Sequence, residues 1–292
     1  MSGAPLEPIA WIDRPGPAGS WGQPRDLALP LNDRGLSFAD GLFETILLEA
    51  GRPRLLEQHL NRWHRSAALL GMASPPSLRR VERLLHGASK RSGIGTGALR
   101  LNWSRGENSQ RGIDLPPLSA AQPNHRCWLQ LSPCQPVFTP VSTILSREER
   151  RNALSRLSRC KTFAYGASIQ ARREAHAAGA DDVLLLSTTG ELCCGSTANL
   201  LIRRGDHWLT PPLSSGCLPG VMRERALELG LVAEAHLRLE DLAKSDGAVL
   251  INSLGCRPLR RCGRTNWATT ELDLPDLTEP SLARQLWRLI LE

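Results

Sequence analysis

The sequence contains little lysine, few aromatic residues and no long apolar run. Only three of the 36 Lys and Arg residues are lysines, and aromatic residues make up 4% of the chain. No apolar stretch reaches the roughly 18 residues that a membrane span needs. The first residues also lack a basic segment followed by an apolar one, so we see no secretory signal. We therefore expect a soluble, cytoplasmic protein that has no membrane partner.

Motifs that would identify several enzyme classes directly are absent as well. The eight cysteines form no C-x-x-C pair, so their spacing does not favour a zinc site, and we expect reduced thiols. The chain has no P-loop, no G-x-G-x-x-G dinucleotide loop, no G-x-S-x-G elbow and no H-E-x-x-H motif. We predict no metal centre, and enzyme classes that depend on these motifs are not favoured.

The charge balance leaves the kind of partner open. The net charge is +7, and 33 of the basic residues are arginines. Such an excess is compatible with nucleic acid, with a membrane surface or with a small anion. Arginine suits bidentate contacts to oxyanions, but a codon bias would enrich it equally. The scarcity of lysine is more useful, because a reaction that needs an amine has only Lys90, Lys161 and Lys244 to draw on.

Hydrophobic periodicity predicts a mixed α/β protein in both halves of the 292 residues. In the first half, we expect strands at 44–49, 98–104 and 127–132 and helices at 54–71 and 77–90. In the second half, we expect helices at 163–178 and 221–230 and strands at 183–187, 199–204, 207–210 and 247–253. Prolines and a basic run near 133–150 indicate a boundary. They predict an N-terminal domain of 1–135, a linker of 136–150 and a C-terminal domain of 151–292.

Lys161 lies in the sequence SRCKTFAYG, between a basic stretch and a predicted helix. An ordinary lysine in this place would be exposed and hydrated. A lysine that acts as a nucleophile needs burial and nearby cations, because these favour its neutral form. Arg156, Arg159 and the residues after Thr162 supply cationic and apolar neighbours in the sequence. Both interpretations stay open on local sequence alone.

The loop at 214–222, SSGCLPGVM, and Arg62 suggest an anion site. The glycines of the loop permit close approach of the backbone, and the N–H groups of Val221 and Met222 open the next predicted helix. Such N–H groups and the helix dipole both attract an anion. Arg62 borders the apolar face of helix 54–71 and would add a cation. An ordinary loop and a solvated arginine are the alternatives.

Taken together, the motifs resemble the class IV, D-amino-acid-aminotransferase-like family of pyridoxal-phosphate enzymes. The matching runs follow one another in the family's order over about residues 28–260. They are D-R-G at 33–35, F-x-D-G-L-F-E-T at 38–45, H-L-x-R at 59–62, S-R-G at 104–106, Lys161, G-E-L-C-C-G-S-T-A-N-L-L at 190–201, L-T-P-P-L-x-x-G-x-L-P-G-V-M-R at 209–223 and I-N-S-L at 251–254. The resemblance implies fold type IV, with a smaller N-terminal α+β domain, a larger C-terminal α/β domain, an active site between them and a homodimer.

The resemblance also assigns roles to residues that are ambiguous alone. It implies that Lys161 binds the cofactor covalently and carries the proton, and that Arg62 contacts the cofactor phosphate. Further phosphate contacts would come from Val221, Met222, Asn252 and Ser253. Substrate carboxylates would be bound by arginines through charge-assisted bonds, and the candidates are Arg100, Arg105 and Arg111.

Cys194 marks a departure from the family pattern. An ungapped count from Gly190 to Asn199 places the glutamate that faces the pyridine nitrogen of the cofactor at Cys194. A carboxylate there keeps the ring protonated and a good electron sink, whereas a thiol with a reference pKa of about 8.5 is a weaker partner. Either Glu191 reaches the position through a local shift, or the ring is less protonated. We favour the second interpretation.

Within the family, the C-C-x-x-x-A-N-L run and the S-R-G loop are most similar to the 4-amino-4-deoxychorismate lyases. These enzymes release pyruvate and form 4-aminobenzoate for folate, through an external aldimine, proton abstraction by lysine and elimination. The resemblance therefore implies pyridoxal 5'-phosphate, a small anionic substrate and no nucleic acid. The alternatives are a branched-chain or D-amino-acid aminotransferase on the same fold, a nucleic-acid-binding protein and an inactive relative.

Overall fold

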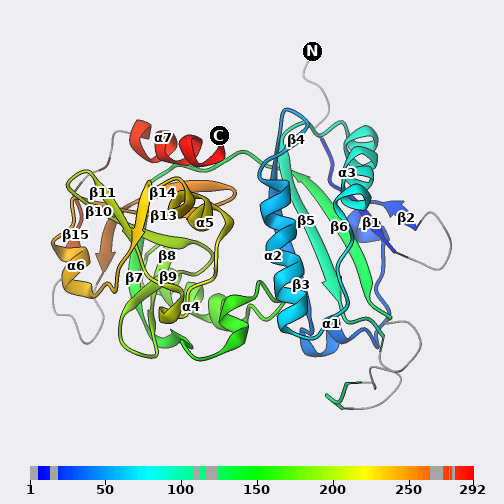
Figure 1. Ribbon diagram of the computed structural model, residues 1–292, viewed down its shortest axis with the longest axis horizontal. Coiled ribbons are helices and arrows are strands. Elements are labelled where there is room, and N and C mark those ends of the chain that lie inside the picture. Colours follow the sequence, from blue (N-terminus) through cyan, green and yellow to red (C-terminus); the bar gives the residue numbers. More distant parts are fainter. Residues whose placement is uncertain are drawn as a thin grey trace. The chain divides into compact units, whose positions relative to one another are not determined.

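The computed structural model describes residues 6–13, 19–107, 112–115, 124–263, 272–275, 277 and 280–292. Its contacts divide the chain into two compact units (Figure 1). The first unit holds Met1–Gln135 and Lys161–Ala164, and the second holds Pro136–Cys160 and Tyr165–Glu292. Lys161 therefore belongs to the first unit, although the residues that flank its segment in the sequence belong to the second.

The first unit is built on an antiparallel sheet that has six strands within the described residues. The strand order is β2-β1-β6-β5-β3-β4. The strands are β1 (Ile9–Ile12), β2 (Ser20–Gly22), β3 (Gly41–Glu49), β4 (Arg52–Pro53), β5 (Gly97–Ser104) and β6 (Arg126–Pro133). In the register, Phe43 lies opposite Asn102 and Thr45 lies opposite Arg100. Because side chains alternate between the two faces of a strand, these four residues share one face of the sheet.

The helices of the first unit are η1 (Pro24–Asp26, a 3-10 helix), α1 (Arg34–Phe38), α2 (Leu56–Leu69) and α3 (Leu78–Ser92). Leu56, Leu60, Trp63 and Ala67 recur at three- and four-residue spacing on α2, and all four are buried. This apolar face packs against β3, so α2 runs along the sheet (Figure 1). The packing explains why the periodicity of the sequence locates this helix correctly.

The second unit is built on a mixed sheet, which has nine strands in the part of the chain that is described. The strands are β7 (Val141–Arg151), β8 (Asp182–Ser187), β9 (Leu192–Gly195), β10 (Asn199–Arg204), β11 (His207–Thr210), β12 (Val232–Glu234), β13 (Ala248–Asn252), β14 (Gly255–Gly263) and β15 (Leu272–Asp273). The order is β12-β11-β10-β13-β14-β7-β8-β9, with β15 on β14. Because β9 also pairs with β10, the six strands from β10 to β9 close into a ring.

Two apolar cores lie on the two sides of this ring. Side chains from all six strands of the ring, including Leu184 of β8, form one core. The neighbours Val183 and Leu185 point the other way and pack with Ala171 and Ala175 of α4 (Gly166–Ala177). The remaining helices are η2 (Arg156–Arg159), η3 (Leu213–Ser215), α5 (Val221–Glu228), α6 (Leu239–Ala243) and α7 (Pro280–Leu291). Among the described helices, none is long and apolar enough to cross a membrane.

The mixed α/β class expected from the sequence is confirmed, but residues 136–150 do not form a linker. They contribute most of β7, which pairs in parallel with β14 and β8. Six successive residues of β7, from Val141 to Ser146, are buried, because the strand lies between these neighbours within the ring. The prolines that suggested a linker end at Pro140, just before the strand begins.

Candidate active site

Lys161 lies on a short segment that pairs with the beginning of β3. The backbone N–H of Phe43 donates to the carbonyl of Lys161 at 2.9 Å, and the N–H of Phe163 donates to the carbonyl of Gly41 at 3.0 Å. Leu42 and Thr162 form the antiparallel bridge between these two bonds. The Nζ atom of Lys161 lies 4.3 Å from the centre of the Phe43 ring. The sheet thus holds the lysine backbone in a fixed register.

A buried triad of Glu44, His59 and Arg62 connects β3 to α2. Arg62 donates from Nε to Glu44 Oε1 at 2.9 Å and from a terminal nitrogen to Oε2 at 2.5 Å. His59 Nδ1 lies 2.7 Å from Glu44 Oε2. All three side chains are at most 5% exposed. The carboxylate therefore fixes the orientation of the arginine that the resemblance implies as a phosphate ligand.

The charges in this triad follow from opposing effects. Burial alone would raise the pKa of Glu44, but the charge of Arg62 and hydrogen bonds from His59 and Arg62 outweigh it and lower the pKa from 4.5 to about 2. Burial lowers the pKa of His59, which the bond to Glu44 only partly opposes. At neutral pH, we therefore assign a carboxylate, a guanidinium and a neutral imidazole whose Nδ1–H donates to Glu44.

In the second unit, Asn199 holds the loop that precedes α5. Its Nδ2 donates to the carbonyl of Leu218 at 3.0 Å. A Cβ atom at Gly220 would lie only 1.9 Å from Asn199 Oδ1, so only glycine fits there. No side chain caps the N-terminus of α5, which begins at Val221. The arrangement leaves the first-turn N–H groups without a side-chain cap, as an anion site requires.

Gly220→Ala is expected to weaken cofactor binding about tenfold or more. The added methyl group must displace either Asn199 or the start of α5, and overpacking of this kind costs about 1–3 kcal/mol. Fluorescence titration with pyridoxal phosphate measures the effect. Gly166→Ala is the matched control, because Gly166 also begins a helix but has open space where a Cβ would stand. Equal affinity in the two variants would contradict the expectation.

The strand register of the second unit brings Cys194 and the Asn252-Ser253 turn close to Asn199. Asn199 of β10 lies opposite Cys194 of β9 on one side and Ile251 of β13 on the other. Asn252 Nδ2 donates to the carbonyl of Thr197 at 3.4 Å. The resemblance implies five cofactor ligands in this unit. Cys194 and Asn252 lie on the strands β9 and β13, Ser253 follows β13 in a turn, and Val221 and Met222 begin α5, directly after the loop that Asn199 holds. In the sequence Asn199 serves only as a marker of spacing, and its contact with the loop before α5 becomes visible only in the fold.

Glu191 does not take the place of a carboxylate at Cys194. Its side chain accepts a hydrogen bond from Ser215 at 2.9 Å and lies 2.9 Å from His236 Nδ1. Cys194 is buried beside Cys193 and Cys217. The hydrogen bonds with Cys194 and Cys217, together with burial, raise the pKa of Cys193, so this thiol stays protonated. These contacts support the ungapped alignment, which places a thiol at the position.

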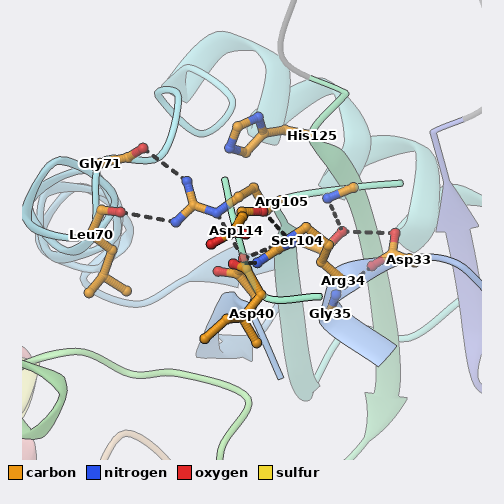
Figure 2. A network of polar contacts seen from close by, with 12 residues as sticks. Asp33, Arg34, Gly35, Asp40, Leu70, Gly71, Ser104, Arg105, Asp114 and His125 are labelled. Atoms are coloured by element: carbon orange, nitrogen blue, oxygen red, sulfur yellow. Dashed lines mark hydrogen bonds and ion pairs between the residues drawn. The ribbon is translucent and has the colours of Figure 1, made fainter. Parts of the chain in front are cut away.

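Arg105 makes contacts that stabilise the first unit (Figure 2). Its Nε donates to Asp40 at 2.8 Å, and its two terminal nitrogens donate to the carbonyls of Gly71 and Leu70 at 2.9 and 3.0 Å. These carbonyls directly follow α2 at its C-terminus, where a cation is favourable. Because each of the three nitrogens donates to the protein, we do not retain Arg105 as a ligand of the substrate.

Arg100 occupies a different environment. Its guanidinium lies 3.7 Å from the centre of the Phe43 ring, and its Nε donates to Asn102 Oδ1 at 2.9 Å. The same ring contacts the Lys161 amine, so the first unit brings together two of the predicted site residues. Stacking on an aromatic ring and a hydrogen bond to a buried amide fix the plane of a guanidinium. Arg111, the other candidate, lies outside the described residues.

A phosphorylated aldehyde cofactor requires an amine, a cation and an uncapped helix start. The described residues include a lysine amine, a buried arginine and such a helix start, and the close fit around Gly220 is compatible with this kind of cofactor. Residues 41–262 match the family model of amino-transferase class IV. The protein belongs to this family, and its cofactor is pyridoxal phosphate.

The relatives carry both lyase and aminotransferase names. A protein of Mycobacterium tuberculosis named bifunctional aminodeoxychorismate lyase / D-amino acid transaminase is 29% identical, covering 80% of this chain and 84% of its own. The aminodeoxychorismate lyase of Bacillus subtilis is also 29% identical, with 81% and 82% covered. The PLP-bound structure of a hypothetical aminotransferase from Mycobacterium tuberculosis is similar at a TM-score of 0.76 and 25% identity, covering 94% of this chain and 96% of that one.

Proposed function

We propose that the protein is a 4-amino-4-deoxychorismate lyase that releases pyruvate and forms 4-aminobenzoate. The observation that carries the proposal is the buried Cys194 thiol, with Glu191 engaged elsewhere. A carboxylate keeps the ring nitrogen of the cofactor protonated, and the protonated ring withdraws electrons strongly. A thiol stabilises this proton less, so the ring is a weaker electron sink. Loss of pyruvate makes the product ring aromatic, so this reaction needs less carbanion stabilisation than transamination. The names of the two relatives at 29% identity support the same activity.

The proposed roles follow from the chemistry of each group. When bound, pyridoxal phosphate supplies the electron sink for breaking a bond at the amine-bearing carbon. Lys161 acts as general base at that carbon and returns a proton to the departing enolpyruvyl group. Arg62, the N–H groups of Val221 and Met222 and the Asn252-Ser253 turn would hold the phosphate. Substrate carboxylates are bound by Arg100 and Arg111.

Incubation with aminodeoxychorismate alone tests the lyase activity. A lyase needs no keto acid, so 4-aminobenzoate is expected to form in its absence. An aminotransferase would need a keto-acid acceptor for continued turnover. D-amino-acid transamination is the second candidate, because one relative carries both names. Turnover of D-alanine with 2-oxoglutarate, but not of aminodeoxychorismate, would favour that second candidate.

Cys194→Glu is expected to raise the rate of side transamination about tenfold or more. A tenfold change in rate corresponds to roughly 1.4 kcal/mol of added stabilisation of the transition state. The introduced carboxylate keeps the cofactor ring nitrogen protonated and strengthens the electron sink. Single-turnover absorbance with D-alanine measures this half-reaction. Cys194→Ala is the control, since it removes the thiol without adding a carboxylate. The proposal fails if the glutamate variant loses lyase activity and gains no transaminase half-reaction.

We also propose that the protein is a homodimer, as the family resemblance implies. Light scattering on the protein eluted from a size-exclusion column measures its mass directly, and a mass of twice the 32.0 kDa of one chain is expected. A mass of one chain at micromolar concentration would contradict this proposal.

A further inference from the structure

Phe163 is partly buried and packs closely against two glycines of the first unit. A Cβ atom at Gly41 would lie 2.2 Å from its ring, and one at Gly35 would lie 2.9 Å from it. The ring centres of Trp128 and Phe43 lie 5.5 and 6.4 Å away. The ring of Phe163 therefore packs against two glycines and lies beside two aromatic rings.

Phe163 and Lys161 are two residues apart in a segment that pairs with β3. Side chains at this separation in an extended segment point to the same side. The Lys161 amine lies over the ring of Phe43, which also lies beside the ring of Phe163. Phe163 therefore anchors the segment from the side on which the amine acts.

The attachment of this segment depends on few bonds. Among the described residues, two backbone hydrogen bonds join residues 161–163 to β3. The flanking residues Cys160 and Tyr165 belong to the second unit. A pairing of this length is weak by itself, because short isolated strand pairs are marginal in water. The side chain of Phe163 supplies the apolar contact that keeps the segment in register.

We propose that Phe163 is a positioning residue for Lys161. Its ring, fixed between Gly35, Gly41 and Trp128, holds the lysine amine at the place where the proposed reaction needs it. Gly41, from the F-x-D-G-L-F-E-T run, has a defined purpose in this arrangement, because any side chain there would expel the ring. The inference rests on the proposed function of Lys161.

The experiment measures how fast pyridoxal phosphate becomes attached to Lys161, with borohydride trapping and mass spectrometry at saturating cofactor. Phe163→Ala is expected to slow attachment about 10- to 100-fold, since small displacements of a reacting group have effects of this size. Phe163→Leu is expected to restore part of the rate. Phe138→Ala is the matched control, because Phe138 packs on Trp287 at 5.3 Å in the second unit, and an unchanged rate is expected.

A second measurement uses the protein without cofactor. Acetylation of Lys161 by acetic anhydride, followed by mass spectrometry, is expected to change in Phe163→Ala and not in Phe138→Ala. Circular dichroism establishes that each variant is folded, and Phe163→Leu carries the test if the alanine variant is not. Attachment and acetylation at the wild-type rate in a folded Phe163 variant would overturn the inference. Absence of attachment to Lys161 in the wild type would instead overturn the proposed function.

Discussion

Lys161→Ala is expected to abolish covalent attachment of pyridoxal phosphate and to lower turnover by about 10²- to 10⁴-fold, the usual contribution of a general base. No arginine can replace this amine, because a guanidinium stays protonated and does not condense with an aldehyde. The loss is expected mainly in kcat, since the contacts of Arg62 and Arg100 are retained. Absorbance of the purified protein and borohydride trapping measure the attachment directly.

The chain provides two matched controls for this variant. Lys90 and Lys244 are the other lysines of the sequence, and both are exposed at the ends of helices. Replacing either with alanine is expected to leave attachment and turnover unchanged. A small primary amine added to Lys161→Ala is expected to restore part of the turnover, because it supplies the missing base. Attachment of the cofactor to Lys90 or Lys244 in the wild type would refute the assignment.

Local patterns in the sequence located several helices and strands in each unit, but not strands such as β7 and β14 or the helix α7. The predicted helix 54–71 is α2 (Leu56–Leu69), and the predicted strand 199–204 is β10 with the same bounds. Periodicity works here because each element buries one face against a neighbour. The predicted helix 163–178 begins only at Gly166, because the preceding residues pair with β3 instead. That pairing joins residues about 120 positions apart, and no local pattern reveals it.

In the candidate site too, some residues follow from local motifs and others depend on contacts between distant segments. The motifs single out Lys161 and Arg62 as candidates, whereas the contacts of Arg105 depend on where α2 ends in space. Glu44 was missed, although the sequence held a signal. A carboxylate within the apolar run ETILLE needs a partner if the strand is buried. His59 and Arg62 lie on the next helix at a spacing that places both on one face.

Glu44→Gln is expected to lower the free energy of unfolding of the cofactor-free protein by about 3–5 kcal/mol, the usual cost of breaking a buried ion pair. The variant leaves Arg62 buried without its carboxylate, and urea denaturation measures the loss. If Arg62 contacts the cofactor phosphate, saturating pyridoxal phosphate supplies a second anion and reduces the loss. Asp40→Asn, which removes the ion pairs to Arg34 and Arg105, is the control that the cofactor is not expected to rescue.

The dependence of stability on pH distinguishes the contribution of Glu44 from that of His59. The pKa of Glu44 is lowered from 4.5 to about 2, so its contribution is complete above pH 4.5 and is lost as the pH falls toward 2. This limb corresponds to about 3 kcal/mol and is expected to disappear in Glu44→Gln. The pKa of His59 is also lowered, so protonation of the unfolded chain reduces stability as the pH falls below 6.5. That limb is expected to remain in Glu44→Gln, because burial of the imidazole causes it. A glutamine variant that keeps the lower limb would show that another carboxylate controls acid unfolding.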